Sequence, residues 1–147
     1  MVERIIPDVV TGQKLRTLEP TATAREAARV MGSKKISAVL VADKKKLIGI
    51  VTERDLAAKV LAGSMDPDKT TLLDIMTPDP DYLSPDDSPE SALELMSTRG
   101  YRHLPVMNND DLIAIVSIRD LYAFVKQKLE EDVKQRDAFM FETGYGA

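Results

Sequence analysis

The stretch GIVTERDL at residues 49–56 returns as AIVSIRDL at residues 114–121. Both copies follow an apolar run, and both place a hydroxyl residue, an arginine and an aspartate in the same order. The repeated phrase is therefore either a pair of helix caps or a pair of binding sites, and the surrounding sequence bears on the choice.

An internal duplication extends outward from this phrase over most of the chain. With an offset of 65 positions, residues 18–60 align with residues 83–125 without a gap. The identical pairs include Pro20/Pro85, Ala27/Ala92, Met31/Met96, Val41/Val106 and Ile50/Ile115. A duplication of this length predicts two copies of one supersecondary structure that bury their apolar faces together.

Each copy predicts a helix, a β-hairpin and a second helix, preceded by a short extended segment. Thr23 and Ser88 have the residue types of N-caps, and Pro89 stands where a first helical residue tolerates proline. Two apolar runs around a polar tip follow, as is typical of a hairpin. These runs are almost continuous, which predicts sheets covered on both faces, mostly by helices. The apolar positions of the first helix are Ala24, Ala27, Ala28 and Met31.

We therefore expect an α/β (α+β) fold of two pseudo-twofold-related β-α-β-β-α repeats that form one module. The expected ranges are 8–62 for the first repeat, 63–72 for a linker, 73–129 for the second repeat and 130–147 for a C-terminal helix extension and tail. The tail contains Phe139, Met140, Phe141 and Tyr145. Such an apolar end is expected either to dock on a partner subunit or to be disordered.

Composition excludes several classes of protein. The chain has 147 residues, no cysteine and one histidine, which excludes disulfides, catalytic thiols and a multi-histidine metal site within one chain. A net charge of −4 argues against general nucleic-acid binding. No apolar run approaches the roughly 20 residues that span a bilayer, and the N-terminus lacks a signal-peptide pattern. We expect a cytoplasmic protein with no metal, nucleic-acid or membrane partner.

The simpler interpretation of the repeated phrase is structural. Thr52 has the residue type of an N-cap, and Asp55 follows three residues later, as in a capping box. A cap, however, does not require an arginine between them. Both copies keep the arginine and the aspartate, while the neighbouring pairs Glu53/Ile118 and Lys59/Phe124 have diverged.

The phrase also has the chemistry of half a nucleotide site. A helix N-terminus attracts phosphate, and an adjacent hydroxyl and arginine add donors to the same anion. An aspartate would repel phosphate, but it accepts hydrogen bonds from ribose hydroxyls in dinucleotide-binding folds.

On these residues the chain resembles a tandem cystathionine β-synthase (CBS) domain pair, or Bateman module, over about residues 8–125. The paired phrases, the strand HLPV and the DVVT and DIMT segments carry the resemblance. It implies two clefts between the repeats that bind AMP, ADP, ATP, NAD(H) or S-adenosylmethionine, with or without magnesium. It also implies a homodimer, no required cofactor, and regulation of a separate effector protein in place of catalysis.

Carried onto this chain, the resemblance assigns Asp55 and Asp120 to ribose, and the hydroxyl and arginine of each phrase to ribose or phosphate. The implied nucleotide-binding residues are Thr52, Arg54, Asp55, Ser117, Arg119, Asp120, Arg102, His103, Ser37, Ala38, Thr11 and Thr77. Arg102 and His103 align with Ser37 and Ala38, so we expect the cleft that they line to bind phosphate more tightly. His103 is either a phosphate ligand, with binding that strengthens below about pH 6.5, or a packed strand residue.

Two alternatives belong to other classes of protein. An enzyme would use Asp55 or Asp120 as an acid or base on a bound nucleotide, and it predicts turnover and a strongly shifted aspartate pKa. A structural dimerisation module with vestigial clefts predicts no effect of any ligand.

Overall fold

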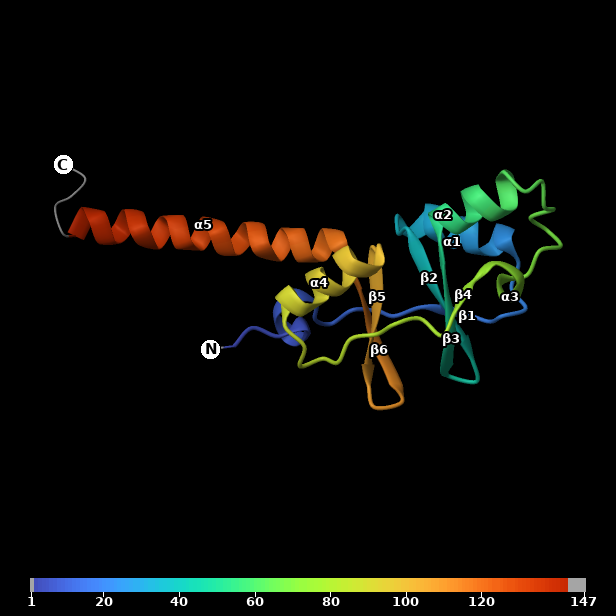
Figure 1. Ribbon diagram of the computed structural model, residues 1–147, viewed down its shortest axis with the longest axis horizontal. Coiled ribbons are helices and arrows are strands. Elements are labelled where there is room, and N and C mark those ends of the chain that lie inside the picture. Colours follow the sequence, from blue (N-terminus) through green and yellow to red (C-terminus); the bar gives the residue numbers. More distant parts are fainter. Residues whose placement is uncertain (1, 143–147) are drawn as a thin grey trace.

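The computed structural model describes residues 2–142, with side chains described through residue 138. It contains a four-stranded sheet of order β1-β2-β3-β4 and a two-stranded sheet of β5 and β6 (Figure 1). The elements are η1 (Ile5–Val9), β1 (Thr17–Leu18), α1 (Ala24–Lys34), β2 (Ala38–Asp43), β3 (Lys46–Thr52), α2 (Glu53–Asp55), η2 (Leu56–Leu61), α3 (Leu72–Ile75), β4 (Thr77–Pro78), α4 (Pro89–Arg99), β5 (His103–Asn108), β6 (Asp111–Ser117) and α5 (Ile118–Glu142). The expected α+β fold of two repeats is confirmed.

The first helix of each repeat begins at the cap that the sequence predicts. The Thr23 hydroxyl accepts a hydrogen bond from the backbone N–H of Glu26, which satisfies one of the free donors of α1. In α4 the Ser88 hydroxyl accepts from the Ser91 N–H, and a proline occupies the first turn. The buried face of α1 differs from the prediction: Ala28, predicted to be apolar core, is exposed, and Val30 is buried instead.

The two hairpins have the same register at the 65-residue offset. Leu40 is opposite Ile50 in β2–β3, and Pro105 is opposite Ile115 in β5–β6. Each hairpin also has an irregularity at the equivalent place, after Val41 and after Val106. Equal registers place the phrases that follow β3 and β6 at equivalent positions of the two repeats.

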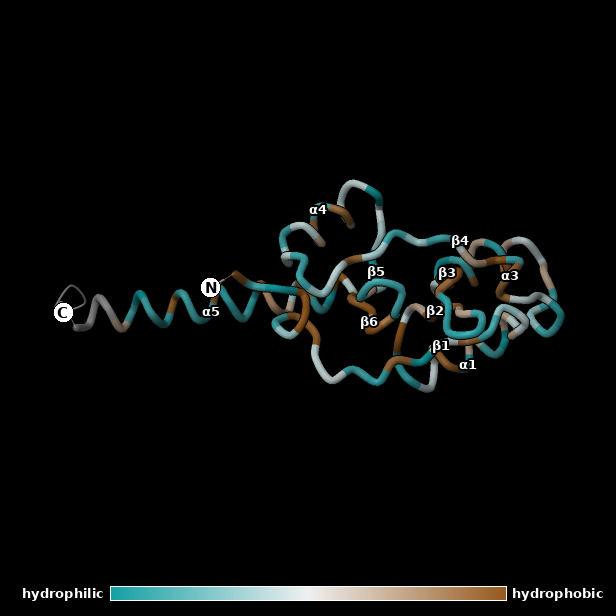
Figure 2. The backbone as a smooth tube through the Cα atoms, turned by 90° about the horizontal axis from the view of Figure 1, so that it is seen from below, coloured by the Kyte–Doolittle hydropathy of each residue, from teal (hydrophilic) through white to brown (hydrophobic). Residues whose placement is uncertain are grey.

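The two faces of the first sheet are covered differently. One face, with Val39, Val41 and Val51, packs on the helices α1, η2 and α3. The other face, with Leu40 and Ile50, packs on Leu112 and Ile115 of the second repeat. The prediction of helices on both faces is wrong for this second face, which the other hairpin covers. Apolar residues accordingly concentrate where the hairpins lie side by side (Figure 2).

The core of each repeat is completed by the short segment that precedes the other repeat in the sequence. Ile5 in η1 is fully buried in the core of the second repeat, against residues such as Met96 and Leu121. Leu72 and Ile75 in α3 are buried in the core of the first repeat. Leu72 is therefore a core residue, whereas the sequence pattern made it the end of the linker. We call residues 5–11 and 72–78 the lead-in segments, and they are exchanged between the repeats.

The lead-in segments contact the sheets by different means. Gly49 lets β4 approach β3, because a Cβ atom at this position would lie 3.0 Å from the Thr77 carbonyl oxygen. The second repeat has Ala114 at the equivalent position. There the side-chain amide of Gln13 replaces a strand, accepting from the Ile115 N–H at 2.8 Å and donating to the Ile115 carbonyl at 3.1 Å.

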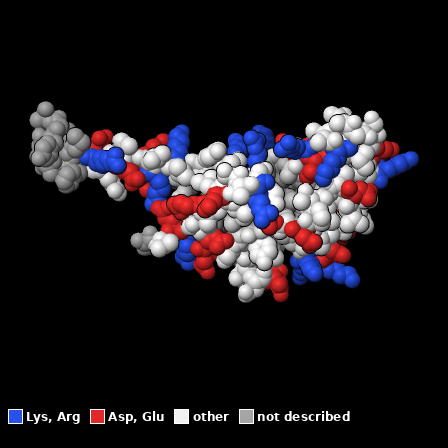
Figure 3. Space-filling model, viewed as in Figure 1, with Lys and Arg blue, Asp and Glu red and all other residues white. Residues whose placement is uncertain are grey.

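The second helices of the repeats have diverged most. In the first repeat η2 is a wide helical turn with i→i+5 hydrogen bonds, such as that from the Ala62 N–H to the Ala57 carbonyl at 2.9 Å. In the second repeat α5 has 25 residues, and its outer part extends away from the body with acidic and basic side chains mixed along it (Figure 3). The side chains of Phe139, Met140 and Phe141, and all of Tyr145, lie outside the described residues. No helix among the described residues has the length and apolarity needed to cross a membrane.

Candidate functional site

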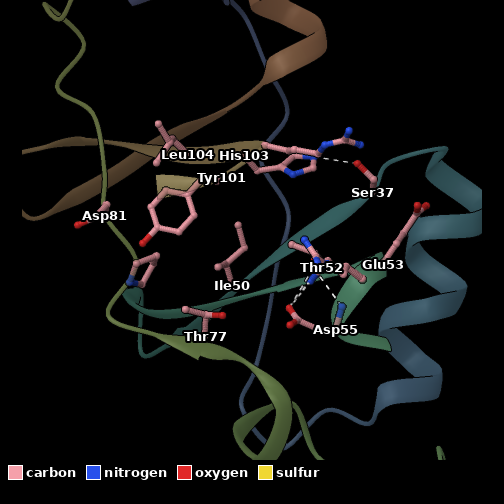
Figure 4. Close-up of a pocket in the computed structure, with 14 residues that line it drawn as sticks. Ser37, Ile50, Thr52, Glu53, Asp55, Thr77, Asp81, Tyr101, His103 and Leu104 are labelled. Atoms are coloured by element: carbon pink, nitrogen blue, oxygen red, sulfur yellow. Dashed lines mark hydrogen bonds between the residues drawn. The ribbon is translucent and has the colours of Figure 1, made fainter. Parts of the chain in front are cut away.

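A cavity of about 490 Å³ lies between the two repeats, within the range of about 300–1,000 Å³ that small-molecule sites occupy. It gathers residues of β3 and α2 from the first repeat, the lead-in segment at Thr77, and the start of β5 from the second repeat (Figure 4). The predicted site residues that line it are Ser37, Thr52, Arg54, Asp55, Thr77, Arg102 and His103. The lining residues that the sequence reasoning missed are Ile50, Glu53, Pro80, Asp81, Gly100, Tyr101 and Leu104.

The repeated phrase forms a helix cap at this cavity. The Asp55 carboxylate accepts hydrogen bonds through Oδ2 from the Thr52 backbone N–H at 2.9 Å and from the Thr52 hydroxyl at 3.1 Å. The Asp55 N–H in turn donates to the Thr52 hydroxyl at 3.2 Å. The predicted capping box is confirmed, and it fixes the carboxylate in the cavity wall. Only 14% of the Asp55 side chain is exposed, and Oδ1 takes no part in the cap.

The second copy of the phrase has the same local geometry. The Ser117 N–H donates to Asp120 Oδ2 at 2.8 Å, and the Asp120 N–H donates to the Ser117 hydroxyl at 3.1 Å. These residues do not line the cavity described above, and neither does Arg119. Thr11 is exposed, and Ala38 is buried in the apolar contact between the hairpins. A second nucleotide cleft at these five residues stays a prediction.

Hydroxyl and cationic groups meet at one end of the cavity. The Ser37 Oγ and His103 Nε2 atoms are 2.8 Å apart and form a hydrogen bond between the two repeats. Arg54 and Arg102 line the same cavity from opposite repeats. Three cationic or potentially cationic side chains therefore line the cavity, together with the acidic side chain of Glu53.

Burial changes the protonation of His103. Desolvation lowers the pKa of the imidazole below its ordinary value of 6.5, and the positive charge of Arg102 lowers it further. The charges of Asp120 and Glu53 act in the opposite direction. His103 is thus both a half-buried strand residue and a cavity-lining group. Its imidazole becomes protonated at a lower pH than the value of about 6.5 that the sequence analysis expected.

An aromatic and an acidic side chain form the opposite end of the cavity (Figure 4). The neighbouring Asp81 carboxylate raises the pKa of the Tyr101 phenol above its ordinary value of 10. At the 65-residue offset Asp81 corresponds to Arg16, and Tyr101 corresponds to Ile36. This end of the cavity is therefore particular to the first of the two predicted clefts, and the signal in the sequence was this difference between the copies.

The pKa of His103 gives a testable effect on stability. Because the folded-state pKa lies below the unfolded value of about 6.5, the folded protein binds fewer protons than the unfolded chain as the pH falls past that value. We expect the free energy of unfolding of the ligand-free protein to drop between pH 7.5 and pH 5.5. Urea titrations should show a smaller drop for His103→Gln. Equal drops in both proteins would show that the pH dependence does not come from the lowered pKa of His103.

Comparison with known proteins agrees with this architecture. The family model of the CBS domain matches residues 2–62 and 72–127. The chain is 32% identical over 126 residues to the CBS domain-containing protein CBSCBSPB2 of Arabidopsis thaliana, a match that covers 85% of this chain and 24% of the relative. The chain therefore spans about a quarter of the length of that relative.

Solved structures share the fold. A protein with CBS domains from Burkholderia ambifaria MC40-6 is 32% identical, with a TM-score of 0.80 over 84% of this chain and 93% of that one. CBSX2, solved in complex with AMP, is 25% identical, with a TM-score of 0.68 over 79% of this chain and 90% of that one. Two consecutive matches to one family model, on a fold of two equivalent hairpin repeats, show that this chain belongs to the CBS domain family and carries two CBS repeats in tandem.

Proposed function

We propose that this CBS pair is a regulatory module that binds an adenosine-containing ligand in the cavity between its repeats. One observation carries the proposal: the cavity unites a fixed carboxylate, two arginines, a histidine and three serine or threonine hydroxyls contributed by both repeats. A cavity lined from both repeats also couples ligand binding to their arrangement, since a ligand favours the arrangement that it binds better.

The ribose is assigned to Asp55. A carboxylate has about four lone-pair positions, and the cap uses two hydrogen bonds to Oδ2. Lys59 contacts Oδ1 at 3.2 Å, and the position that remains on this oxygen can accept from a ribose hydroxyl, which donates without carrying charge. The capping box holds the carboxylate before the ligand arrives, so little conformational freedom is lost on binding.

The phosphate is assigned to the end with Arg54, Arg102 and His103. Charge-assisted hydrogen bonds from guanidinium groups are stronger than neutral ones, and Ser37 adds a hydroxyl beside the imidazole. The apolar side chains of Ile50 and Leu104, with the ring of Tyr101, leave room for a base on the other side of the ribose. AMP is the first ligand to test, because the related CBSX2 binds it.

A thermal-shift panel tests the proposal. The ligands are AMP, ADP, ATP, NAD, NADH and S-adenosylmethionine, each with and without magnesium, and CMP serves as the control for the base. A ligand at a hundred times its Kd should add about 2.7 kcal/mol to the free energy of unfolding. A shift with an adenosine compound and none with CMP is the expected result. No shift with any compound would favour the structural dimerisation module, and conversion of a nucleotide, followed by chromatography, would favour the enzyme.

Signalling is part of the same proposal. The ligand state would pass to a separate effector protein through the arrangement of the repeats within a homodimer. Analytical ultracentrifugation with and without the bound nucleotide tests the dimer, and a sedimentation coefficient that corresponds to a monomer under both conditions would contradict it.

A further inference from the structure

Lys59 joins three elements around the cavity. Its ammonium group donates a hydrogen bond to the Ile75 carbonyl at 2.7 Å and forms an ion pair with Asp55 Oδ1 at 3.2 Å. Lys59 lies in η2, Asp55 in α2 and Ile75 at the end of α3. The ammonium therefore contacts the carboxylate oxygen that the capping box leaves unused.

The contact with Ile75 extends to a second segment that lines the cavity. The last carbonyls of a helix have no partner within the helix, and a cation at this end is favourable. Ile75 ends α3, and Thr77, two residues later, begins β4 and lines the cavity. One ammonium contacts both the Asp55 carboxylate and the Ile75 carbonyl. It therefore fixes the position of Asp55 relative to the segment that carries Thr77.

The second repeat has no counterpart of this contact. The residue equivalent to Lys59 is Phe124, which carries neither a charge nor a donor. Asp120 nevertheless keeps the same capping box as Asp55. The two repeated phrases therefore share the cap, but among the described residues an ion pair with a lysine is found at Asp55 and not at Asp120.

We propose that Lys59 is a positioning residue that sets the geometry and the charge of the first nucleotide cavity, an inference that rests on the proposed function. Its ammonium holds Asp55 and the second lead-in segment together, and it offsets the negative charge of the carboxylate. A phosphate that enters the cavity is repelled less by a paired carboxylate than by an unpaired one. Lys59 therefore favours AMP over uncharged adenosine, although it does not line the cavity itself.

The first measurement needs no ligand. Hydrogen–deuterium exchange of the ligand-free protein should be faster in residues 72–78 of Lys59→Met than of the wild type, because the carbonyl of Ile75 loses its donor. Lys59→Arg should keep the wild-type exchange. Lys46→Met is the matched control, since it removes the same charge at the far end of the β2–β3 hairpin. Unchanged exchange in residues 72–78 of Lys59→Met would overturn the proposal.

The second measurement compares AMP with adenosine by isothermal titration calorimetry. For Lys59→Met we expect AMP affinity to fall about tenfold and adenosine affinity to fall about threefold, because only AMP meets the added repulsion. Lys59→Arg should lie within about threefold of the wild type for both ligands. Equal losses for AMP and adenosine would overturn the charge assignment. If the wild type binds neither ligand while Lys59→Met still loosens residues 72–78, the proposed function fails and the positioning role stands.

Discussion

Asp55→Ala is expected to weaken the binding of an adenosine ligand in the cavity about 100-fold. The substitution removes the charge-assisted hydrogen bond that Asp55 Oδ1 accepts from ribose, worth up to about 3 kcal/mol, and a 100-fold change corresponds to about 2.8 kcal/mol. It also removes the capping box with Thr52, which should lower the free energy of unfolding of the ligand-free protein by about 1 kcal/mol. Calorimetric titration with AMP measures the first effect, and urea titration measures the second.

A second capping box, at the start of α3, separates these two effects. The Asp74 carboxylate accepts from the Thr71 N–H at 3.3 Å and from the Thr71 hydroxyl at 3.0 Å, as Asp55 does with Thr52. Asp74 does not line the cavity. Asp74→Ala should therefore lose a similar amount of stability and keep its affinity for AMP. If Asp55→Ala and Asp74→Ala lost affinity equally, Asp55 would act through the fold alone.

Local features of the fold could be predicted from the sequence because neighbouring residues determine them. The caps at Thr23 and Ser88 depend on hydroxyls that reach an N–H three residues away. The hairpins depend on almost continuous apolar runs around short polar tips, where Lys44 and Lys45 adopt positive φ values of 49° and 69°. Such features need no knowledge of the tertiary arrangement.

The exchange of the lead-in segments could not be predicted in this way. The DVVT and DIMT segments precede their own repeats in the sequence, and nothing local shows that each packs on the other repeat. The helices at Ile5–Val9 and Leu72–Ile75 are also short, so periodicity gives little signal. Tertiary burial of Ile5 and Leu72 decides their positions, and this depends on contacts distant in the sequence.

The candidate site likewise contains residues that the local sequence predicted and residues that only the tertiary packing brings to it. The repeated phrase identified Thr52 and Asp55 because their chemistry is local. The alignment brought out Arg102 and His103, but it could not say that they face the phrase of the first repeat. Only the packing of the β5–β6 hairpin against the β2–β3 hairpin places them there. Tyr101 and Asp81 were missed because they lie outside every motif, and only the difference between the two copies at these positions marks them in the sequence.

Ile5→Ala is expected to lower the free energy of unfolding by about 2–5 kcal/mol, although residue 5 lies outside the repeat that the sequence predicts. Its side chain is 0% exposed and packs on residues such as Leu83 and Met96 in the core of the second repeat. Its backbone N–H donates to the Asp87 carbonyl at 2.8 Å, which aligns the segment with the beginning of α4. The loss of a buried side chain leaves a cavity that the neighbouring side chains of this core do not fill. Urea titration followed by circular dichroism measures the change.

Val2→Ala is the matched control for this prediction. Val2 is 84% exposed in the same segment, so its truncation should change the free energy of unfolding by less than about 0.5 kcal/mol. A cost below that value for Ile5→Ala as well would show that the N-terminal segment does not complete the second core. Because the lead-in segments are exchanged, neither core is complete without residues from the other half of the chain. We therefore expect Ile5→Ala to shift one cooperative transition of the whole chain, and separate transitions of the two repeats would contradict this interdependence.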